Sequence, residues 1–237
     1  MAASPKLFAL CAAALLLAAS LPLPAAALII DDFGAGDFTL EEDSLEGGPS
    51  MLEVSGLPTT NVVGGVRGVW QQATGNLSTS RVVGNSTSGT AAITPLVGTN
   101  MDVDTRFHYD GIANGVDDTF NGALALDLSG FDVVEISATA AFVDAEVRLF
   151  LYTSTQLQIR DAPLVTAGIT SFDLSTYTLD LSDIQAIRVA INNLTLAELV
   201  TIDSIQAVAV PEPAAGVLLG VGLAGLGLRK RRGAHPA

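Results

Sequence analysis

Residues 102–109, which read DVDTRFHY, decide the fold because uncharged and charged side chains alternate along them. One face of an extended chain would carry Val103, Thr105, Phe107 and Tyr109. The other face would carry Asp102, Asp104, Arg106 and His108. Successive side chains of a β-strand point to opposite faces, so this period of two predicts a strand with one buried and one solvated face.

Three later stretches repeat the pattern. Their apolar positions are Val134, Ile136, Ala138 and Ala140, then Val147, Leu149 and Leu151, then Ile187, Val189 and Ile191. Glu135, Glu146, Arg148, Arg188 and Asn192 lie between or beside them on the opposite faces. No comparable stretch has the 3.6-residue period of an amphipathic helix. The body is therefore predicted to be all-β, an antiparallel sandwich of two sheets that each bury one face. Residues 74–94, rich in Ser, Thr, Asn and Gly, are either a loop or a hairpin with a polar exterior.

Residues 1–27 have the three parts of a secretory signal peptide, which would form a signal helix. Lys6 lies in the charged region, residues 7–21 form the apolar region, and Ala25 and Ala27 form the small-residue cleavage site. Export through the Sec translocon and cleavage by signal peptidase would make Leu28 the new N-terminus. The alternative is an N-terminal anchor that is not cleaved.

Residues 210–232, VPEPAAGVLLGVGLAGLGLRKRR, also have three parts. Pro211, Glu212 and Pro213 keep the chain extended, because proline fixes φ and lacks a backbone donor. Residues 214–228 are uncharged and predict a transmembrane helix, although about 22 Å of helix falls short of the roughly 30 Å hydrocarbon core. The cations Arg229, Lys230, Arg231 and Arg232 would stay in the cytoplasm. The alternative is a C-terminal helix packed on the core.

This tail resembles the PEP-CTERM sorting signal of Gram-negative bacteria that make exopolysaccharide. The resemblance implies that exosortase, a membrane-embedded cysteine protease, cuts near residues 211–213. The inner membrane would hold the precursor only transiently, and the product would reach the cell surface or the extracellular matrix. An association with exopolysaccharide or biofilm follows from the same resemblance.

The body, residues 28–209, is strongly acidic. Of the 11 Lys and Arg residues five lie in the two end segments, and of the 25 Asp and Glu residues only Glu212 does. The body thus has six arginines, no lysine and 24 carboxylates, a formal net charge of −18. Such a charge argues against nucleic acid and anionic membrane surfaces as partners.

Short aliphatic-Asp phrases in the body are similar to those of jelly-roll, galactose-binding-like and carbohydrate-binding-module sandwiches. They include LIIDDF at residues 28–33, LDLSGF at 126–131 and TIDSI at 201–205. The resemblance implies a jelly-roll-like sandwich, in which a structural calcium ion often joins the first strand to the last. Asp31 or Asp32 and Asp203 are the candidate ligands here. In the alternative, Asp203 forms a hydrogen bond at a strand bulge, Asp31 and Asp32 are solvated, and no cofactor is needed.

Glycan binding would need exposed rings. The possible platform residues are Trp70, Tyr109, Tyr152 and Tyr177, and Trp70 and Tyr109 are the candidates. Trp70 is alternatively a core residue, because Val66 and Val69 beside it are apolar. The body contains one histidine, no cysteine and no G-x-S-x-G motif, so an enzyme is not predicted. The sequence therefore favours a non-enzymatic exported surface or matrix protein. The alternative function is that of a glycan-binding module.

Overall fold

A computed structural model describes residues 26–43, 48–113, 122–140, 145–165, 167–195 and 199–210. The predicted signal peptide up to Ala25 lies outside these residues. So do the motif at 211–213, the apolar run at 214–228 and the basic cluster at 229–232. The chain divides into two units, and one of them, Ala26–Ala209, contains every residue of the hydrophobic core. This unit therefore has a complete core of its own.

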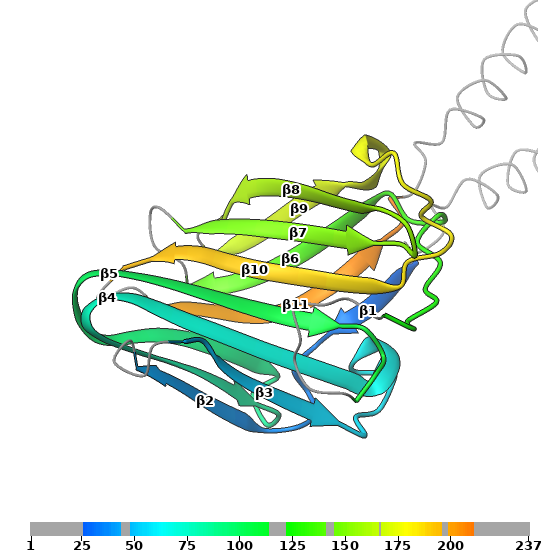
Figure 1. The fold of residues 1–237 in the computed structure, drawn as a ribbon. Coiled ribbons are helices and arrows are strands. Elements are labelled where there is room, and N and C mark those ends of the chain that lie inside the picture. The colour runs from blue at the N-terminus through cyan, green and yellow to red at the C-terminus, as the bar shows by residue number, and fades with distance from the viewer. Residues whose placement is uncertain are drawn as a thin grey trace, which may run out of the picture. The chain divides into compact units, whose positions relative to one another are not determined.

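The described residues form strands and short 3-10 turns, with no α-helix among them (Figure 1). The strands are β1 (Ala27–Asp31), β2 (Phe38–Asp43), β3 (Ser50–Ser55), β4 (Val66–Asn85), β5 (Thr90–Tyr109), β6 (Val133–Ala140), β7 (Glu146–Tyr152), β8 (Leu157–Pro163), β9 (Gly168–Asp173), β10 (Ala186–Leu194) and β11 (Val200–Val208). The 3-10 turns are η2 (Val63–Gly65) and η3 (Leu174–Thr176). Every strand pair is antiparallel, which confirms the predicted all-β sandwich.

Two 20-residue strands, β4 and β5, build both layers of the sandwich. The first half of β4 pairs with β3 and its second half with β2, while β5 pairs with β11 near its start and with β10 near its end. Sheet I is therefore β8-β7-β10-β5-β4-β3, and sheet II is β9-β6-β11-β5-β4-β2, with β1 also paired to β11. Register shifts between Thr74 and Ser80 mark where the hairpin bends, as β-bulges do. Residues 74–94 thus form the middle of a hairpin and not a loop.

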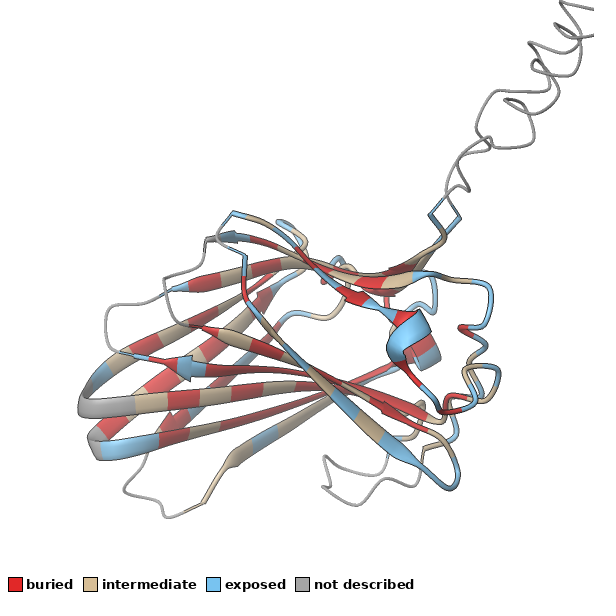
Figure 2. Ribbon diagram, turned by 90° about the horizontal axis from the view of Figure 1, so that it is seen from above, coloured by how far each residue is buried: buried red, intermediate tan, exposed pale blue. Residues whose placement is uncertain are grey.

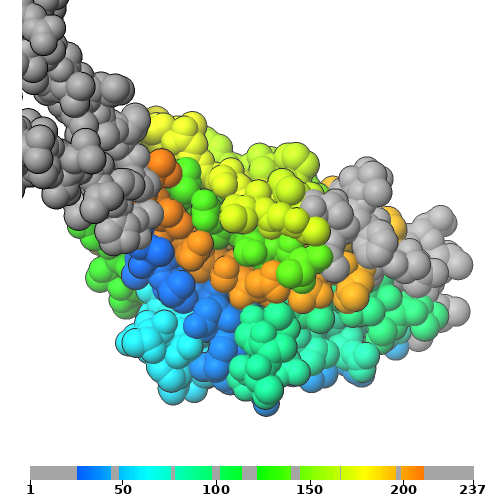
Figure 3. All heavy atoms as spheres, turned by 180° about the vertical axis from the view of Figure 1, so that it is seen from behind, coloured from blue at the N-terminus to red at the C-terminus, as the bar shows by residue number. Residues whose placement is uncertain are grey.

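The first and last strands are neighbours in sheet II. On one edge of β11, residues 205–208 pair with β1 and residues 200–202 pair with β5. On the other edge β11 pairs with β6. Figure 3 shows β11 in orange, with β1 in blue beside it. This pairing places the predicted mature N-terminus next to the end of the last strand.

The core lies between the two sheets and follows the predicted alternation. Val103, Phe107 and Tyr109 of β5 are fully buried, as are Val147, Leu149 and Leu151 of β7 and Ile187, Val189 and Ile191 of β10. Figure 2 shows buried positions alternating with more exposed ones along the strands. The side chains between the core positions of sheet I face away from the core, and several of them are also buried.

Candidate functional site

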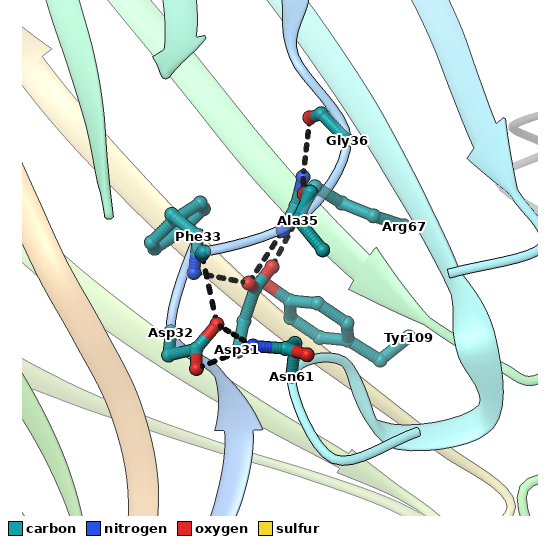
Figure 4. A network of polar contacts seen from close by, with 9 residues as sticks. Asp31, Asp32, Phe33, Ala35, Gly36, Asn61, Arg67 and Tyr109 are labelled. Atoms are coloured by element: carbon teal, nitrogen blue, oxygen red, sulfur yellow. Dashed lines mark hydrogen bonds and ion pairs between the residues drawn. The ribbon is translucent and has the colours of Figure 1, made fainter. Parts of the chain in front are cut away.

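Asp31, one candidate calcium ligand, ends β1 in the interior with no exposed surface. Both of its oxygens accept hydrogen bonds from Arg67 of β4, with Nε 2.5 Å from Oδ2 and Nη2 2.6 Å from Oδ1 (Figure 4). The backbone N–H of Phe33 donates to Oδ1 (2.8 Å), and the Tyr109 hydroxyl donates to Oδ2 (2.9 Å). Four donors occupy the roughly four lone-pair positions of a carboxylate. Asp31 is therefore the partner of a buried arginine and does not present a free oxygen to calcium.

Arg67 also holds the segment that follows β1. Its Nη1 donates to the carbonyl oxygens of Ala35 (3.1 Å) and Gly36 (3.2 Å), and its guanidinium lies 5.0 Å from the ring centre of Phe33. Burial opposes the charge of Arg67, but the hydrogen bonds and charge of Asp31 raise its pKa above the ordinary value. Burial raises the pKa of Asp31, and the bonds from Arg67 oppose this rise. The geometry is that of a buried, bidentate ion pair.

Asp32 and Asp203 have other partners. The Asn61 amide donates to both oxygens of Asp32 (2.9 and 3.2 Å), and the N–H of Gly34 donates to Oδ1 (2.8 Å). Asp203 lies at a register shift of the β11–β6 pair and accepts a long hydrogen bond from Thr139 Oγ1 (3.5 Å) on β6. No group of three or more His, Cys, Asp or Glu side chains within the described ranges could hold a metal ion. The three carboxylates do not form one ligand set, and Asp203 is placed as in the strand-bulge alternative.

The two candidate platform rings are not open to a sugar. Tyr109 is fully buried in the core and bonds to Asp31. Trp70 lies on the outer face of sheet I and outside the core cluster, but only 4% of its surface is exposed. The guanidinium of Arg106 covers its ring, 3.8 Å from the ring centre. The expected platform of Trp70 and Tyr109 is therefore not formed, because one ring points into the core and an arginine covers the other.

The outer face of sheet I brings together residues that lie as far apart in the sequence as Trp70 and Arg188. In one row across the strands, Arg188 of β10 lies between His108 of β5 and Phe150 of β7. In the next row, Ala190 of β10 pairs with Arg106 of β5, which pairs with Trp70 of β4. We name this surface the arginine–aromatic face and define it as Trp70, Arg106, His108, Phe150, Tyr152 and Arg188.

Guanidinium groups stack on rings throughout this face. Arg188 lies 5.3 Å from the ring centre of Phe150 and 5.8 Å from that of Tyr152. These two rings are nearly parallel, with an interplanar angle of 8° and centres 6.4 Å apart. Ala190 faces outward but is only 1% exposed, so its long neighbours cover it. Cation–π contacts of this kind favour a charged arginine on an aromatic surface.

His108 is uncharged at neutral pH because of its position in this face. Burial, followed by the positive charges of Arg188 and Arg106, lowers its pKa from 6.5 to about 3. Its cross-strand neighbour on the other side is Gly68, which has no side chain. The face thus contains two guanidinium groups and one neutral imidazole.

We expect acidification to destabilise the folded protein through His108. The unfolded chain takes up a proton at His108 near pH 6.5, whereas the folded protein does not do so until about pH 3. Stability should therefore fall as the pH falls through this window, by about 2–3 kcal/mol between about pH 6 and about pH 4. Urea unfolding of the wild type and of His108→Gln at both pH values checks this. Between these two pH values, the loss of stability should be smaller in the variant than in the wild type by about 2–3 kcal/mol. Equal losses in the two proteins would mean that the imidazole is charged in the fold.

A polar, carboxylate-rich row adjoins the arginine–aromatic face. Arg148 of β7 forms ion pairs with Glu146 (3.0 Å) and with Asp161 of β8 (3.2 Å). With the oxygen and nitrogen of its amide exchanged, Asn192 accepts from Arg148 Nε (3.2 Å) and donates to Asp104 Oδ1 (3.1 Å), which satisfies both atoms. Burial, and then the charge of Asp102, raises the pKa of Asp104. The outer face of sheet I thus offers both donors and acceptors.

Sequence reasoning placed Arg106, Arg148 and Arg188 on the outward positions of their strands but did not bring them together. The useful signal was that each lies at an alternate position of a predicted strand. Only the strand order makes them neighbours. Strands β7, β10 and β5 lie side by side in the sheet but do not follow one another in the sequence.

The described part of the chain contains no helix with the length and hydropathy of a membrane span. The body is similar in fold to a family 11 carbohydrate-binding module from Clostridium thermocellum, solved in complex with a β-1,3-1,4-mixed-linked tetrasaccharide. The identity is 14%, the match covers 73% of this chain and 97% of that chain, and the TM-score is 0.32. It is also similar to the family 11 module of a cellulosomal cellulase of the same organism, with 11% identity, coverage of 79% and 97%, and a TM-score of 0.36.

A comparison with curated proteins gave no match. The family model that matches is the PEP-CTERM protein-sorting motif, over residues 209–232. These residues directly follow β11, which ends at Val208. The chain therefore carries a PEP-CTERM protein-sorting motif immediately after the last strand of a β-sandwich.

Proposed function

We propose that this protein is an exported, non-enzymatic surface or extracellular-matrix protein that exosortase processes at its C-terminal motif and that associates with exopolysaccharide or biofilm. The match of residues 209–232 to the sorting motif carries the proposal. In this mechanism Pro211, Glu212 and Pro213 are recognised, residues 214–228 hold the precursor in the inner membrane, and Arg229–Arg232 remain in the cytoplasm. Signal peptidase removes residues 1–27 and leaves Leu28 as the N-terminus.

The strand pairing shows how much of the fold each cut would remove. Ala27 pairs with Val208, and the N–H of Ala209 donates to the carbonyl of Ala26 (2.9 Å). Cleavage after Ala27 would remove the first residue of β1 and this hydrogen bond, but it would leave Leu28, Ile29 and Asp31 paired with β11. Neither cut would remove a residue of the hydrophobic core, because that core begins at Leu28 and Ile30 and ends at Ala207.

A second candidate function is glycan binding by the sandwich. The observation that favours it is the arginine–aromatic face, together with the adjoining donors and acceptors of Asn192 and Asp104. Hydrogen-bonding groups of this kind suit the hydroxyls of a sugar ring. The module would then attach the exported protein to the matrix.

Intact mass and terminal sequencing of the protein from the host's membrane, surface and medium test the proposed function. The chain has only two lysines, Lys6 and Lys230, and both lie in the segments expected to be removed. The mature protein should therefore have one primary amine, at Leu28, and react with one amine label. A product outside the inner membrane that ends near residues 211–213 is expected. A chain that keeps Arg229–Arg232 in the inner membrane would contradict the proposal.

A further inference from the structure

The two ends at which the chain is proposed to be cut meet in one strand pair of sheet II. Ala27 of β1 pairs with Val208 of β11, and the carbonyl oxygen of Ala26 accepts from the N–H of Ala209 (2.9 Å). Ala27 is the last residue before the proposed signal-peptidase cut, and Ala209 is the first residue of the matched sorting motif. In the full chain, the end of the proposed signal peptide is therefore bonded to the start of the sorting motif.

Strand β1 is also held in the body on the far side of the cut. Ile30 is fully buried in the core, and Asp31 forms the buried ion pair with Arg67. Proteases cut a folded chain through its locally open form, so the rate of cutting follows the fraction of molecules in which the segment has left the fold. Pairing of β1 with β11 therefore protects the bond between Ala27 and Leu28 from signal peptidase.

This protection begins late, because the partner of β1 is the last strand of the body. Among the described strands, β1 pairs with β11 alone. At a synthesis rate of about 5–20 residues per second, roughly 10–35 s separate the appearance of Ala27 from that of Val208. During this interval β1 has no strand to pair with, and the bond after Ala27 is accessible. The appearance of β11 ends the interval.

The first cut also changes the start of the sorting motif. It removes Ala26, whose carbonyl oxygen accepts the N–H of Ala209 in the full chain. Val208 still pairs with Val133 of β6, and its carbonyl oxygen still accepts from the N–H of Asp132 (3.0 Å). The sheet thus stays closed up to Val208, while Ala209 loses this partner. A protease that binds an extended segment through its backbone groups gains a donor next to the prolines of the motif.

We propose that the pair of β1 and β11 orders the two cuts: signal peptidase acts first, before β1 pairs, and exosortase acts second, on the chain that starts at Leu28. A chain that pairs β1 with β11 while still uncut is a poor substrate for both proteases, because one strand pair holds residues of both ends. The inference rests on the proposed function, since it concerns the order of the two proposed cuts. It gives signal cleavage the further role of preparing the substrate of exosortase.

Pulse-chase labelling of the full chain in the native host, with the intact mass of each species, tests this order. The precursor should give a chain that starts at Leu28 and keeps its tail, and this chain should give the mature protein. No species that has lost the tail but keeps residues 1–27 is expected.

Ala25→Leu carries the sharper test, because it removes a small residue that signal peptidase needs and lies outside β1. This variant should keep residues 1–27 and should lose its tail about tenfold more slowly than the wild type, equivalent to about 1.4 kcal/mol. Adding Ala209→Pro removes the N–H that bonds to Ala26. The double variant should still keep residues 1–27 but should recover most of the rate of tail removal.

Two controls separate the strand pair from other effects of these substitutions. Ala209→Pro alone should be cut at both ends like the wild type, which shows that proline at this position leaves the motif functional. Ala25→Leu/Leu199→Pro places the proline just before the other end of β11, away from β1, and should lose its tail as slowly as Ala25→Leu.

Two outcomes would overturn the inference. The first is that Ala25→Leu keeps residues 1–27 but loses its tail at the wild-type rate. The second is that Ala209→Pro does not relieve the delay, which would attribute it to the retained signal segment and not to the strand pair. In both cases the wild-type tail is still cut, so the proposed function stands. A wild-type tail that is never cut would contradict the proposed function and the order of cuts together.

Discussion

Replacing Arg67 with methionine is expected to lower the free energy of unfolding by about 3–5 kcal/mol, the cost of leaving a buried charge without its partner. Asp31 and Arg67 are both fully buried and share two short hydrogen bonds. Methionine fills part of the volume but leaves the carboxylate of Asp31 with only the donors from Phe33 and Tyr109. The carbonyl oxygens of Ala35 and Gly36 would lose a donor as well. Urea unfolding followed by circular dichroism measures the loss.

Arg81→Met is the matched control, because it removes the same side chain from an exposed ion pair. Arg81 and Glu41 are 3.5 Å apart, with side-chain exposures of 42% and 60%. Exposed pairs contribute little, so this variant should lose at most about 1 kcal/mol. If Arg67→Met cost no more than Arg81→Met, the buried pair would not be charged in the fold. A smaller loss in Asp31→Leu/Arg67→Met than in Arg67→Met alone would attribute the cost to the uncompensated carboxylate.

The alternating strands could be predicted from the sequence because the alternation of apolar and polar residues lies within each strand. Residues 102–109 bury Val103, Thr105, Phe107 and Tyr109 as their period of two requires. The long bent hairpin could not be read in the same way. Its bend lies at register shifts near Thr74–Ser80, and the polar sequence there is equally suited to a loop. Only the pairing of its two ends with different strands shows that it continues through both sheets.

The candidate site was harder to predict because its contacts join distant parts of the chain. The Asp31 carboxylate looks like a cation ligand in LIIDDF, but Arg67, 36 residues further on, takes both of its oxygens. Alternation shows which face Trp70 occupies but not that Arg106 lies over its ring. For the same reason, the sequence did not show that Arg106 and Arg188 lie on neighbouring strands. In each case the deciding neighbour comes from another strand, and strand order is not a local property of sequence.

Replacing Pro211, Glu212 and Pro213 with alanine is expected to abolish removal of the tail and leave the precursor in the inner membrane. The three residues lie within the motif matched at residues 209–232, and we propose that they are the part exosortase recognises. Two prolines favour an extended backbone, which a protease can bind, and three alanines would instead favour helix. Pulse-chase labelling with fractionation in the native host measures processing. The tail should be retained in essentially all of the variant protein.

A second tail variant separates recognition by sequence from a general effect of changing the tail. Gly220→Ala/Gly222→Ala/Gly225→Ala also changes three residues, but it leaves residues 211–213 and the basic cluster intact, and it should be processed like the wild type. Both sets lie outside the unit Ala26–Ala209, so neither should alter the unfolding transition of the body. If the 211–213 variant were processed at the wild-type rate, cleavage would not depend on these three residues. The sorting signal would then reside in the apolar run and the basic cluster, whose charge sets the orientation of the precursor before any cut is made.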